Sequence, residues 1–320
     1  MGRFARFDSF GATADVLRIV DDEPPHPGPG EVRVRVRANG LNPVDYKIIN
    51  SGKSAANYGL TDPHGTGVGF DLAGDVDEVG RGVTRFAVGD AVLGGRRHGA
   101  IADFAIVRVE GEGGAAASDV ERDGVLIAKP DTLDYDTAGA LAVAGRTAIA
   151  AVDRVGAGPG DTVFVSAAAG GVGVIASQLA VLRGATVIGT ASRGNHEFLR
   201  ELGVIPIAYG DELAQRLSDA APHGLTAALD CHGPESVDAA LDLGVPLDRL
   251  NTIAARGHRG AQGVGNPQAT MQQFAEIVRL VADGRIAVPI QAIYPIERLV
   301  DAYARLEAGH VRGKLIVVTE

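Results

Sequence analysis

A glycine-rich turn between two apolar runs contains the residues best suited by type and spacing to do chemistry. Its small residues follow the pattern Ala167-x-x-Gly170-x-x-Gly173, with alanine in place of the first glycine of the strict fingerprint. Residues without bulky side chains let the backbone approach a pyrophosphate, whose charge is stabilised at the start of the following helix. We therefore expect a dinucleotide to bind along Ala168, Ala169, Gly170, Gly171, Val172 and Gly173. The alternative is a tight turn that binds nothing.

The residues after the next apolar run predict which dinucleotide binds. Where this type of fingerprint places an acidic residue against the ribose 2′-hydroxyl, the chain reads Thr190-Ala191-Ser192-Arg193. A hydroxyl and a guanidinium suit a 2′-phosphate, and they offer no acceptor to a free diol. We expect Thr190, Ser192 and Arg193 to bind the cofactor, which favours NADPH over NADH. Alternatively, Arg193 is a solvated residue at the start of the next helix.

The elements that must position this turn alternate between strand and helix from Val125 onward. Such alternation predicts βαβ units and a parallel sheet. The expected strands are Thr162–Ala167, Ala185–Thr190, Val204–Ala208, Thr226–Asp230, Leu250–Ala254 and a terminal Lys314–Thr319. The expected helices are Val172–Arg183, Asn195–Leu202, Asp211–Asp219, Gln268–Asp283 and a short Glu297–Leu306.

Residues 1–127 predict strands and turns instead. Glu31–Gly40 alternates apolar and charged side chains with period two, which is typical of a half-buried strand with its arginines toward solvent. Phe70–Gly95 predicts short strands of a barrel, and we expect them to break at Gly74, Gly80, Gly82, Gly89 and Gly94. Glu110–Gly124 lacks periodicity and is expected to be an exposed insertion.

Composition narrows the function classes. The 320 residues include 40 acidic and 30 basic side chains, a net charge of −10 without a basic stripe, which disfavours nucleic-acid and membrane-surface partners. The single cysteine, Cys231, excludes an intramolecular disulfide and a thiolate zinc cage. We see no signal peptide at the start and no apolar stretch long enough to span a membrane, so a cytoplasmic location is expected.

Six motifs in one order cover almost the whole chain: FDSFGATADVLRIV, PGPGEVRVRVRANGLNPVDYKI, GFDLAGDVDEVGRGVTRFAVGDAV, VAGRTA, SAAAGGVG and GHVRGKLIV. Through them the sequence resembles the zinc-independent medium-chain dehydrogenases/reductases of the quinone oxidoreductase (zeta-crystallin-like) group. The resemblance implies a GroES-like β-barrel-type domain over 1–127, a Rossmann NADP-binding α/β domain over 128–267, and a segment over 268–320 that returns to the first domain. It also implies an active site in the cleft between the domains, and a homodimer.

The resemblance implies that a catalytic metal is missing. Zinc-dependent relatives use a Cys, a His–Glu pair and a further Cys or Asp, whereas the corresponding stretches here read NPVDYK and GFDLAG. His26, His64 and His98, with Asp45 and Asp71, lack a recognisable ligand spacing. We expect these histidines to be surface residues.

Without a metal, hydride transfer depends on positioning and on hydrogen bonds to the developing oxyanion. The best candidates are Asn42, Asp45, Tyr46 and Lys47, in a loop that the resemblance places beside the nicotinamide. Either the Tyr46 hydroxyl or the Lys47 ammonium could donate to a quinone or enone oxygen. The alternative is a turn with a surface ion pair between Asp45 and Lys47.

The resemblance implies further cofactor-binding positions: Thr147, Tyr209, Ile253, Ala254, Ala255 and Lys314. Arg146 departs from the apolar residue usual before that threonine. We interpret Cys231 and His232 as residues at the edge of the cofactor or as packing residues.

Together these features predict an NADPH-dependent, metal-free oxidoreductase that transfers hydride to a small-molecule quinone or α,β-unsaturated carbonyl. Reduction of an enoyl thioester and alcohol–ketone interconversion stay open, because fold and cofactor do not determine the electrophile. A non-enzymatic NADPH-binding sensor or interaction protein on the same scaffold is the alternative from a different class.

Overall fold

The computed structural model describes residues 1–109 and 124–319, so the predicted insertion lies outside the described residues except for Gly124. The chain divides into two compact units. Unit 1 comprises Met1–Val143, Ile290–Gly309 and Lys314–Glu320, and unit 2 comprises Ala144–Pro289 and His310–Gly313. The sequence-based domain limits at residues 127 and 267 stay predictions.

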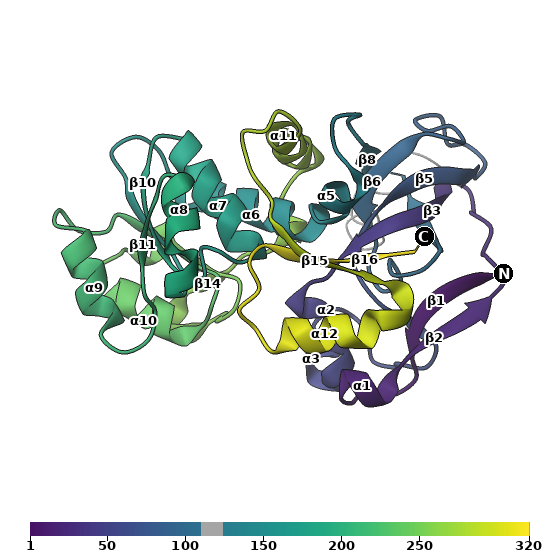
Figure 1. The fold of residues 1–320 in the computed structure, drawn as a ribbon, viewed down its shortest axis with the longest axis horizontal. Coiled ribbons are helices and arrows are strands. Elements are labelled where there is room, and N and C mark those ends of the chain that lie inside the picture. The colour runs from purple at the N-terminus through teal and green to yellow at the C-terminus, as the bar shows by residue number, and fades with distance from the viewer. Residues whose placement is uncertain (110–123, 320) are drawn as a thin grey trace. The chain divides into compact units, whose positions relative to one another are not determined.

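Unit 2 contains a parallel sheet in the order β11-β10-β9-β12-β13-β14, of which Figure 1 labels β10, β11 and β14. Its strands are β9 (Thr162–Val165), β10 (Thr186–Thr190), β11 (Val204–Ile207), β12 (Ala227–Asp230), β13 (Leu250–Thr252) and β14 (Gln262–Gly263). The strand order reverses at β9, because β10 and β11 extend to one side and β12 and β13 to the other. In open α/β sheets such a reversal is where ligands bind, beyond the carboxyl ends of the strands.

Helices alternate with these strands, as the sequence predicts. They are α6 (Ala142–Val155), α7 (Gly171–Leu182), α8 (His196–Glu201), α9 (Leu213–Ala220), α10 (Pro234–Asp242) and α11 (Met271–Ala282), with short 3-10 turns η1 (Arg193–Asn195), η2 (Leu247–Arg249), η3 (His258–Gly260) and η4 (Asn266–Gln268). The predicted strands and helices of this region are confirmed, with small shifts at their ends. We did not predict α6 and α10.

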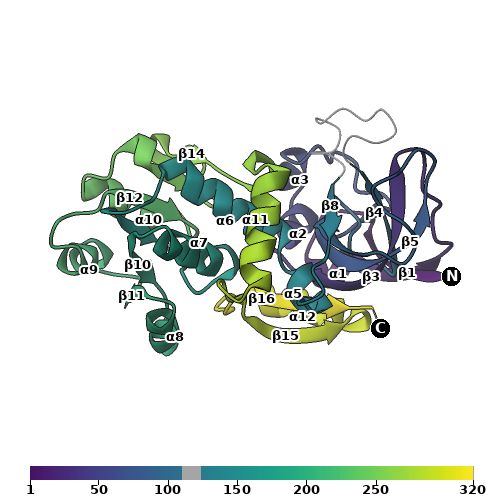
Figure 2. The ribbon, with the colours of Figure 1, turned by 90° about the horizontal axis from the view of Figure 1, so that it is seen from above.

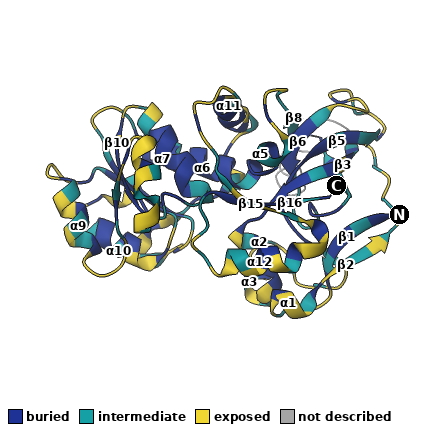
Figure 3. Cartoon of the chain, viewed as in Figure 1, coloured by how far each residue is buried: buried dark blue, intermediate teal, exposed yellow. Residues whose placement is uncertain are grey.

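Burial explains why these segments form the centre of unit 2. All four residues of β12 are buried, and most of α7 is buried as well (Figure 3). Strands covered on both faces need apolar side chains throughout, which is typical of parallel sheets. Helix α11 lies beside α6 (Figure 2), where Gly145 admits the Ile277 side chain.

Unit 1 is built mainly from antiparallel strands. One sheet has the order β15-β16-β3-β5-β6-β8, with β7 also pairing with β3, and a smaller sheet has the order β2-β1-β4. The strands are β1 (Gly2–Phe7), β2 (Leu17–Asp22), β3 (Glu31–Gly40), β4 (Thr66–Gly67), β5 (Asp71–Val79), β6 (Ala91–Gly95), β7 (Phe104–Arg108), β8 (Val125–Ala128), β15 (Ile290–Pro295) and β16 (Lys314–Val318). The helices are α1 (Thr13–Val16), α2 (Pro43–Asn50), α3 (Gly52–Ala56), α5 (Tyr135–Gly139) and α12 (Leu299–Glu307), with the 3-10 turn η5 (Ile296–Arg298).

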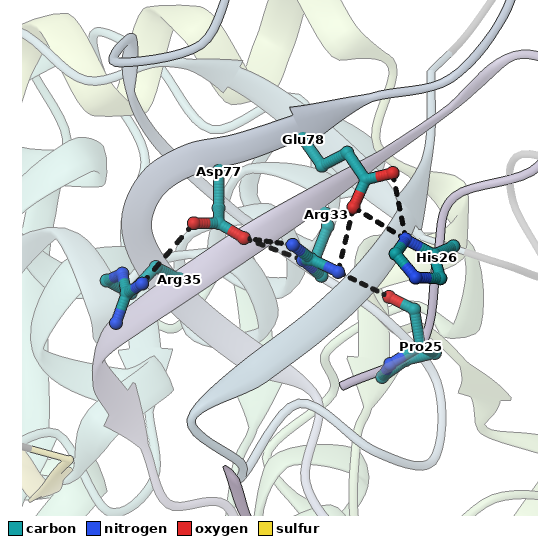
Figure 4. Close-up of polar contacts among 6 residues, drawn as sticks. All are labelled: Pro25, His26, Arg33, Arg35, Asp77 and Glu78. Carbon is teal, nitrogen blue, oxygen red and sulfur yellow. Dashed lines mark hydrogen bonds and ion pairs between the residues drawn. The ribbon is translucent and has the colours of Figure 1, made fainter. Parts of the chain in front are cut away.

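Strand β3 confirms the predicted alternation. Its valines are buried in the core, whereas its arginines point outward. Figure 4 shows Arg33 between the carboxylates of Asp77 and Glu78, with Arg35 bound to the other side of Asp77. The arginines of this strand therefore make surface ion pairs on the outer face of the sheet.

Two glycines of the predicted strand breaks lie inside strands, so that part of the prediction is wrong. A Cβ on Gly74 would lie 2.1 Å from the Arg35 carbonyl oxygen, and one on Gly94 would lie 1.9 Å from that of Val125. Glycine allows close backbone approach within a sheet at these positions. The expectation of only strands and turns over residues 1–127 is also wrong, since α1, α2 and α3 are helices.

Among the described residues, we find no helix that combines the length and the apolar character needed to cross a membrane.

Candidate functional site

The glycine-rich turn connects β9 to α7 at the point where the strand order reverses. Ala167 adopts φ +47°, the left-handed conformation that glycine adopts most easily. Thr190 holds this backbone, because its hydroxyl accepts from the Ala167 amide at 3.0 Å and its carbonyl accepts from the Ala168 amide at 2.9 Å. Thr190, at the end of the neighbouring strand β10, therefore stabilises the backbone of the turn.

Gly173 packs α7 tightly on the turn. A Cβ at Gly173 would lie 2.3 Å from the Ala167 carbonyl oxygen, so any side chain there would push the helix away. Helix α7 begins after Gly170, and no side chain among the described residues caps its amides. A helix N-terminus of this kind suits a phosphate, because its amides and dipole favour negative charge. The turn thus fits the pyrophosphate of a dinucleotide.

A segment from near the chain's end passes beside this turn within unit 2. The Gly313 amide donates to the Ala169 carbonyl at 2.8 Å, and Gly313 forms an isolated bridge with Gly170. In the same segment, Arg312 donates to the Asn195 side chain at 2.6 Å and to the Gly194 carbonyl at 3.2 Å. Arg312 therefore binds the residues that directly follow Arg193.

The predicted 2′-phosphate residues lie at the carboxyl end of β10. Ser192 precedes η1 and accepts from the Asn195 side chain at 3.2 Å, while Arg193 begins η1 and is exposed. Arg312 also places its guanidinium 5.0 Å from the centre of the Phe198 ring. Arg312 was not among the predicted cofactor-binding residues, although its basic side chain in the GHVRGK motif was a readable signal.

Tyr209 follows β11 and is 44% exposed. Its ring lies nearly parallel to those of His232, at 6.5 Å, and His310, at 6.4 Å. The Tyr209 hydroxyl is 3.4 Å from Nδ1 of His310. The structure therefore brings Tyr209 together with the 310–313 segment that carries Arg312.

A buried polar network supports the loop after β13. Asp230 accepts from Ser166 at 2.9 Å and from Thr252 at 2.5 Å. The Thr252 hydroxyl in turn accepts from the amides of Ala254 and Ala255 at 3.0 and 2.7 Å. The predicted residues Ile253, Ala254 and Ala255 are thus fixed at the carboxyl end of the sheet.

Two predicted residues of unit 2 remain, Thr147 on α6 and Cys231 after β12. Thr147 is buried on α6, and the neighbouring Arg146 is buried too, with its guanidinium donating to the Ala269 carbonyl at 3.0 Å. Burial raises the pKa of the Cys231 thiol far above its ordinary range, so this cysteine stays protonated at neutral pH.

In unit 1 the NPVDYK motif forms helix α2, so the prediction of a loop is wrong. Asn42 is the N-cap with Pro43 in the first turn, and the Asp45 carboxylate accepts from the Asn42 amide at 2.8 Å. This arrangement is a capping box, which starts a helix locally. Because successive helical residues are rotated by about 100°, Asp45 points inward while Lys47 is exposed. The alternative of a surface ion pair between them is therefore wrong.

Asn42 belongs to a buried hydrogen-bonded cluster. The Lys314 ammonium donates to the Asn42 Oδ1 at 2.6 Å and to the Asp71 Oδ2 at 3.1 Å. The Asn42 Nδ2 donates to the same Asp71 oxygen at 2.9 Å, and the Val143 amide donates to the other at 2.7 Å. Lys314, predicted to bind cofactor, thus directs its ammonium to side chains of unit 1.

Asp45 borders this cluster and is 2% exposed. Its pKa is raised to about 7, mainly because the carboxyl group is buried and in part because of the nearby Asp71 carboxylate, against the lowering effects of the Asn42 amide, Lys314 and Tyr303. Burial and the Asp45 carboxyl also raise the pKa of Tyr303, whose side chain is fully buried. Tyr303 therefore stays protonated beside Asp45.

Tyr46 and Lys47 lie on other faces of α2. Tyr46 is half-buried, and burial together with the Glu307 carboxylate raises its pKa, so its hydroxyl is a proton donor at neutral pH. Lys47 is exposed. The structure therefore brings together Asn42 and Asp45, while Tyr46 and Lys47 are directed elsewhere.

The expectation that His98 is a surface residue is wrong. Burial lowers its pKa to about 4, and its Nε2 atom is buried without a hydrogen bond to any described residue. The His98 ring makes an edge contact with Phe70, with 5.7 Å between ring centres. His26 and His64 are exposed as expected, and His26 binds Glu78 (Figure 4).

The residues do not fit a zinc site. In the part of the chain that the structure describes, no three His, Cys, Asp or Glu side chains could hold a metal ion together. Both Asp71 oxygens accept hydrogen bonds within unit 1, from Lys314, Asn42 and Val143. Asp71 is therefore engaged by these donors and does not serve as a zinc ligand here.

Comparisons with known proteins now identify the family. The alcohol dehydrogenase GroES-like domain family matches residues 28–118, and the zinc-binding dehydrogenase family matches residues 202–317. The chain is 29% identical to the chloroplast envelope quinone oxidoreductase homolog of Arabidopsis thaliana, over 98% of this chain and 97% of that protein.

Two solved structures extend the comparison. The quinone oxidoreductase from Coxiella burnetii is 29% identical with a TM-score of 0.85, over 100% of this chain and 99% of that one. An NAD-dependent alcohol dehydrogenase is 25% identical with a TM-score of 0.82, over all of both chains. Both the GroES-like and the parallel α/β folds predicted from sequence are confirmed. The chain is an oxidoreductase that belongs to the quinone oxidoreductase group of the medium-chain dehydrogenases/reductases.

Proposed function

We propose that the chain is a metal-free, NADPH-dependent oxidoreductase that reduces a quinone or an α,β-unsaturated carbonyl. The observation that carries the cofactor assignment is the basic margin at the carboxyl end of β10. Arg193 begins η1 there, and Arg312 binds the two residues that follow it. Two guanidinium groups suit a 2′-phosphate, which NADPH has and NADH lacks.

The turn supports the same cofactor. Gly170 and Gly173 leave the start of α7 open to a pyrophosphate, and the segment at Gly313 borders the turn. When bound, NADPH would supply a hydride, and the reduced substrate would take up one proton from a protein group or from water. The acceptor class follows from the family, whose relative from Arabidopsis thaliana is named a quinone oxidoreductase homolog.

The protein's own donors are Tyr46 and Lys47. The Tyr46 hydroxyl is held in its protonated form by burial and by Glu307, so it can donate to an oxyanion. The exposed Lys47 ammonium offers a second donor. Asn42 is engaged by Lys314 and Asp71, and we assign it to positioning the start of α2.

The test is NADPH oxidation, followed by absorbance, with a benzoquinone, a naphthoquinone, an enal, an enoyl thioester and a ketone. We expect turnover with a quinone or the enal, and preference for NADPH over NADH. Removing one oxyanion donor lowers kcat by roughly 10²-fold in a well-studied acyl-transfer enzyme, so Tyr46→Phe or Lys47→Ala should show a loss of that order. Lys53→Ala is the matched control, since Lys53 is an exposed lysine on α3.

The outcomes separate the candidate functions. Turnover with only the enoyl thioester or only the ketone would overturn the assigned class of acceptor, but it would leave the assignment of NADPH as cofactor intact. Tight NADPH binding without turnover of any acceptor would overturn the proposal in favour of a non-enzymatic sensor. Homodimer formation and a cytoplasmic location stay predictions.

A further inference from the structure

Unit 1 buries more acid than base in one place. Four segments contribute to a cluster made of Asn42, Asp45, Asp71, Tyr303 and Lys314, and each of these residues is less than 5% exposed. The cluster contains two carboxyl groups and only one ammonium group. Burying an unbalanced charge is costly, and a buried group takes up or releases a proton to avoid it.

The hydrogen bonds show which carboxyl group is balanced. Asp71 receives three donors, from Lys314, Asn42 and the Val143 amide. Asp45 receives one, from the Asn42 amide on Oδ2, whereas its buried Oδ1 makes no hydrogen bond with any residue that the structure describes. The uncompensated position in the cluster is therefore Oδ1 of Asp45.

Two other buried polar atoms lie close to Asp45. The Tyr303 hydroxyl interacts with the Asp45 carboxyl, and within the described part of the chain neither this hydroxyl nor Nε2 of His98 completes a hydrogen bond. Asp45 and His98 line the same small cavity, whose volume is about 10 Å³ and whose other walls include Phe7, Ile48 and Phe70. That volume is close to the minimum for one water molecule.

A proton on Asp45 would remove the excess buried negative charge and would give Oδ1 a hydrogen bond to make. A neutral carboxylic acid gains an O–H donor at Oδ1, and the Tyr303 oxygen or a cavity water bound to His98 can accept from it. The cluster then has one carboxylate, on Asp71, balanced by one ammonium, on Lys314. The other groups that face Asp45 do not take this role, because Tyr303 stays protonated and His98 stays neutral near pH 7.

Asp45 is also the third residue of the α2 capping box, directly before Tyr46. An ionised Asp45 accepts more strongly from the Asn42 amide and interacts better with the helix dipole, but it places a second negative charge beside Asp71. Its protonation state therefore changes the cap on which the direction of Tyr46 depends.

We propose that Asp45 is a proton-carrying positioning residue: it is a neutral carboxylic acid in the resting protein, and its ionisation changes the α2 cap and thereby the placement of Tyr46. The effect on Tyr46 rests on the proposed function, whereas the protonation of Asp45 does not. The substrate-free protein can therefore test the first half separately.

Infrared difference spectroscopy across neutral pH tests the proton itself, since a protonated carboxyl has a carbonyl stretch that a carboxylate lacks. We expect the wild-type protein to show this band below neutrality and to lose it as the pH rises. Asp45→Asn should lack the titrating band, and Asp301→Asn, which removes an exposed carboxylate on α12, should keep it. Isotope-labelled aspartate in the wild-type chain shows whether the band belongs to an aspartic acid if Asp45→Asn fails to fold, and Asp136→Asn then excludes the other described aspartate whose pKa burial raises. A band unchanged in Asp45→Asn, or no aspartic acid band at all, would overturn the proposal.

The pH profile of kcat/KM tests the positioning role. We expect an ionisation near neutral pH in the wild-type protein that is lost in Asp45→Asn and kept in Asp301→Asn. If the band titrates while Asp45→Asn keeps the wild-type pH profile, Asp45 carries a proton but does not position Tyr46, and that half of the proposal fails. If no acceptor is reduced at any pH, the proposed function and the positioning role fail together, while the infrared result still decides the protonation of Asp45.

Discussion

Two regions of this molecule use charge in opposite ways. The cluster around Lys314 and Asp71 in unit 1 is buried, with side chains 3% and 0% exposed. The basic margin of unit 2, by contrast, has an exposed Arg193, and Arg312 binds neighbouring neutral groups. In the first region charges must balance within the protein because water does not reach them. In the second, water screens the charge of the exposed Arg193.

The largest expected effect on stability comes from breaking the buried ion pair between Lys314 and Asp71. Lys314→Met removes the ammonium that Asp71 and Asn42 bind. Removing one partner of a buried ion pair costs about 3–5 kcal/mol, because the remaining charge is left unpaired. We expect a loss of that size in the free energy of unfolding, measured by urea denaturation.

Arg298→Met is the control for this prediction. Arg298 pairs with Asp301 on the surface, with side chains 61% and 58% exposed, so its removal should change stability by about 0–1 kcal/mol. Equal losses in the two variants would contradict the distinction between buried and screened charge. Adding Asp71→Asn to Lys314→Met should recover part of the loss, since it removes the unpaired carboxylate.

The sequence predicted the strand, tight turn and helix of the glycine-rich segment, but it did not predict the buried cluster. The turn is a local pattern, in which a strand, small residues and a helix follow one another. The cluster depends on long-range pairing, because Lys314 is 272 positions from Asn42 and 243 from Asp71. Asn42 and Asp45 were singled out as catalytic from their types, but only the fold shows that they point into a core.

Asp45 and His98 line one cavity, and their contributions to stability are expected to change in opposite directions with pH. The pKa of Asp45 is raised from 3.8 to about 7, so the folded protein keeps a proton that the unfolded chain releases in this range. Its contribution to stability is therefore lost as pH rises through this window. The pKa of His98 is lowered from 6.5 to about 4, so its contribution is present above pH 6.5 and is lost as pH falls toward 4.

Between about pH 4 and pH 6.5, the contributions of Asp45 and His98 to the pH dependence of stability should cancel in the wild-type protein. Relative to the wild-type protein, Asp45→Asn should become more stable with rising pH and His98→Asn less stable, each by up to about 1.4 kcal/mol per pH unit. Asparagine suits position 98, because His98 has φ +58° and asparagine tolerates this conformation. Unfolding free energies measured by urea at several pH values would check this. Parallel profiles in all three proteins would show that neither group has the shift that its burial implies.

The NPVDYK helix was missed because only eight residues form it, too few for a helical apolar pattern to stand out. Its start was nevertheless readable, since Asn42, Pro43 and Asp45 have the types and spacing of an N-terminus. Arg312 was missed for a different reason. Its basic side chain was visible in the GHVRGK motif, but its place beside the residues that follow Arg193 was not, because the 310–313 segment reaches the turn from the far end of the chain.

The smallest expected effect on stability comes from the basic margin. Arg193→Ala should change the free energy of unfolding by no more than about 0.5 kcal/mol, because Arg193 is exposed. Arg312→Ala should cost somewhat more, since it also loses the contact with the Phe198 ring. Affinity should respond differently: a hydrogen bond to a charged group contributes about 1.5–3 kcal/mol, so each variant should weaken NADPH binding by roughly 10- to 100-fold.

Calorimetric titration with NADPH and NADH separates this role from a general weakening of the turn. NADH lacks the 2′-phosphate, so its affinity should change little in either variant, and Arg200→Ala, an exposed arginine on α8, should leave both cofactors unaffected. If Arg193→Ala and Arg312→Ala weakened both cofactors equally, these side chains would not bind the phosphate. The margin would then resemble the buried cluster, where charge supports the fold, and the distinction between the two regions would fail.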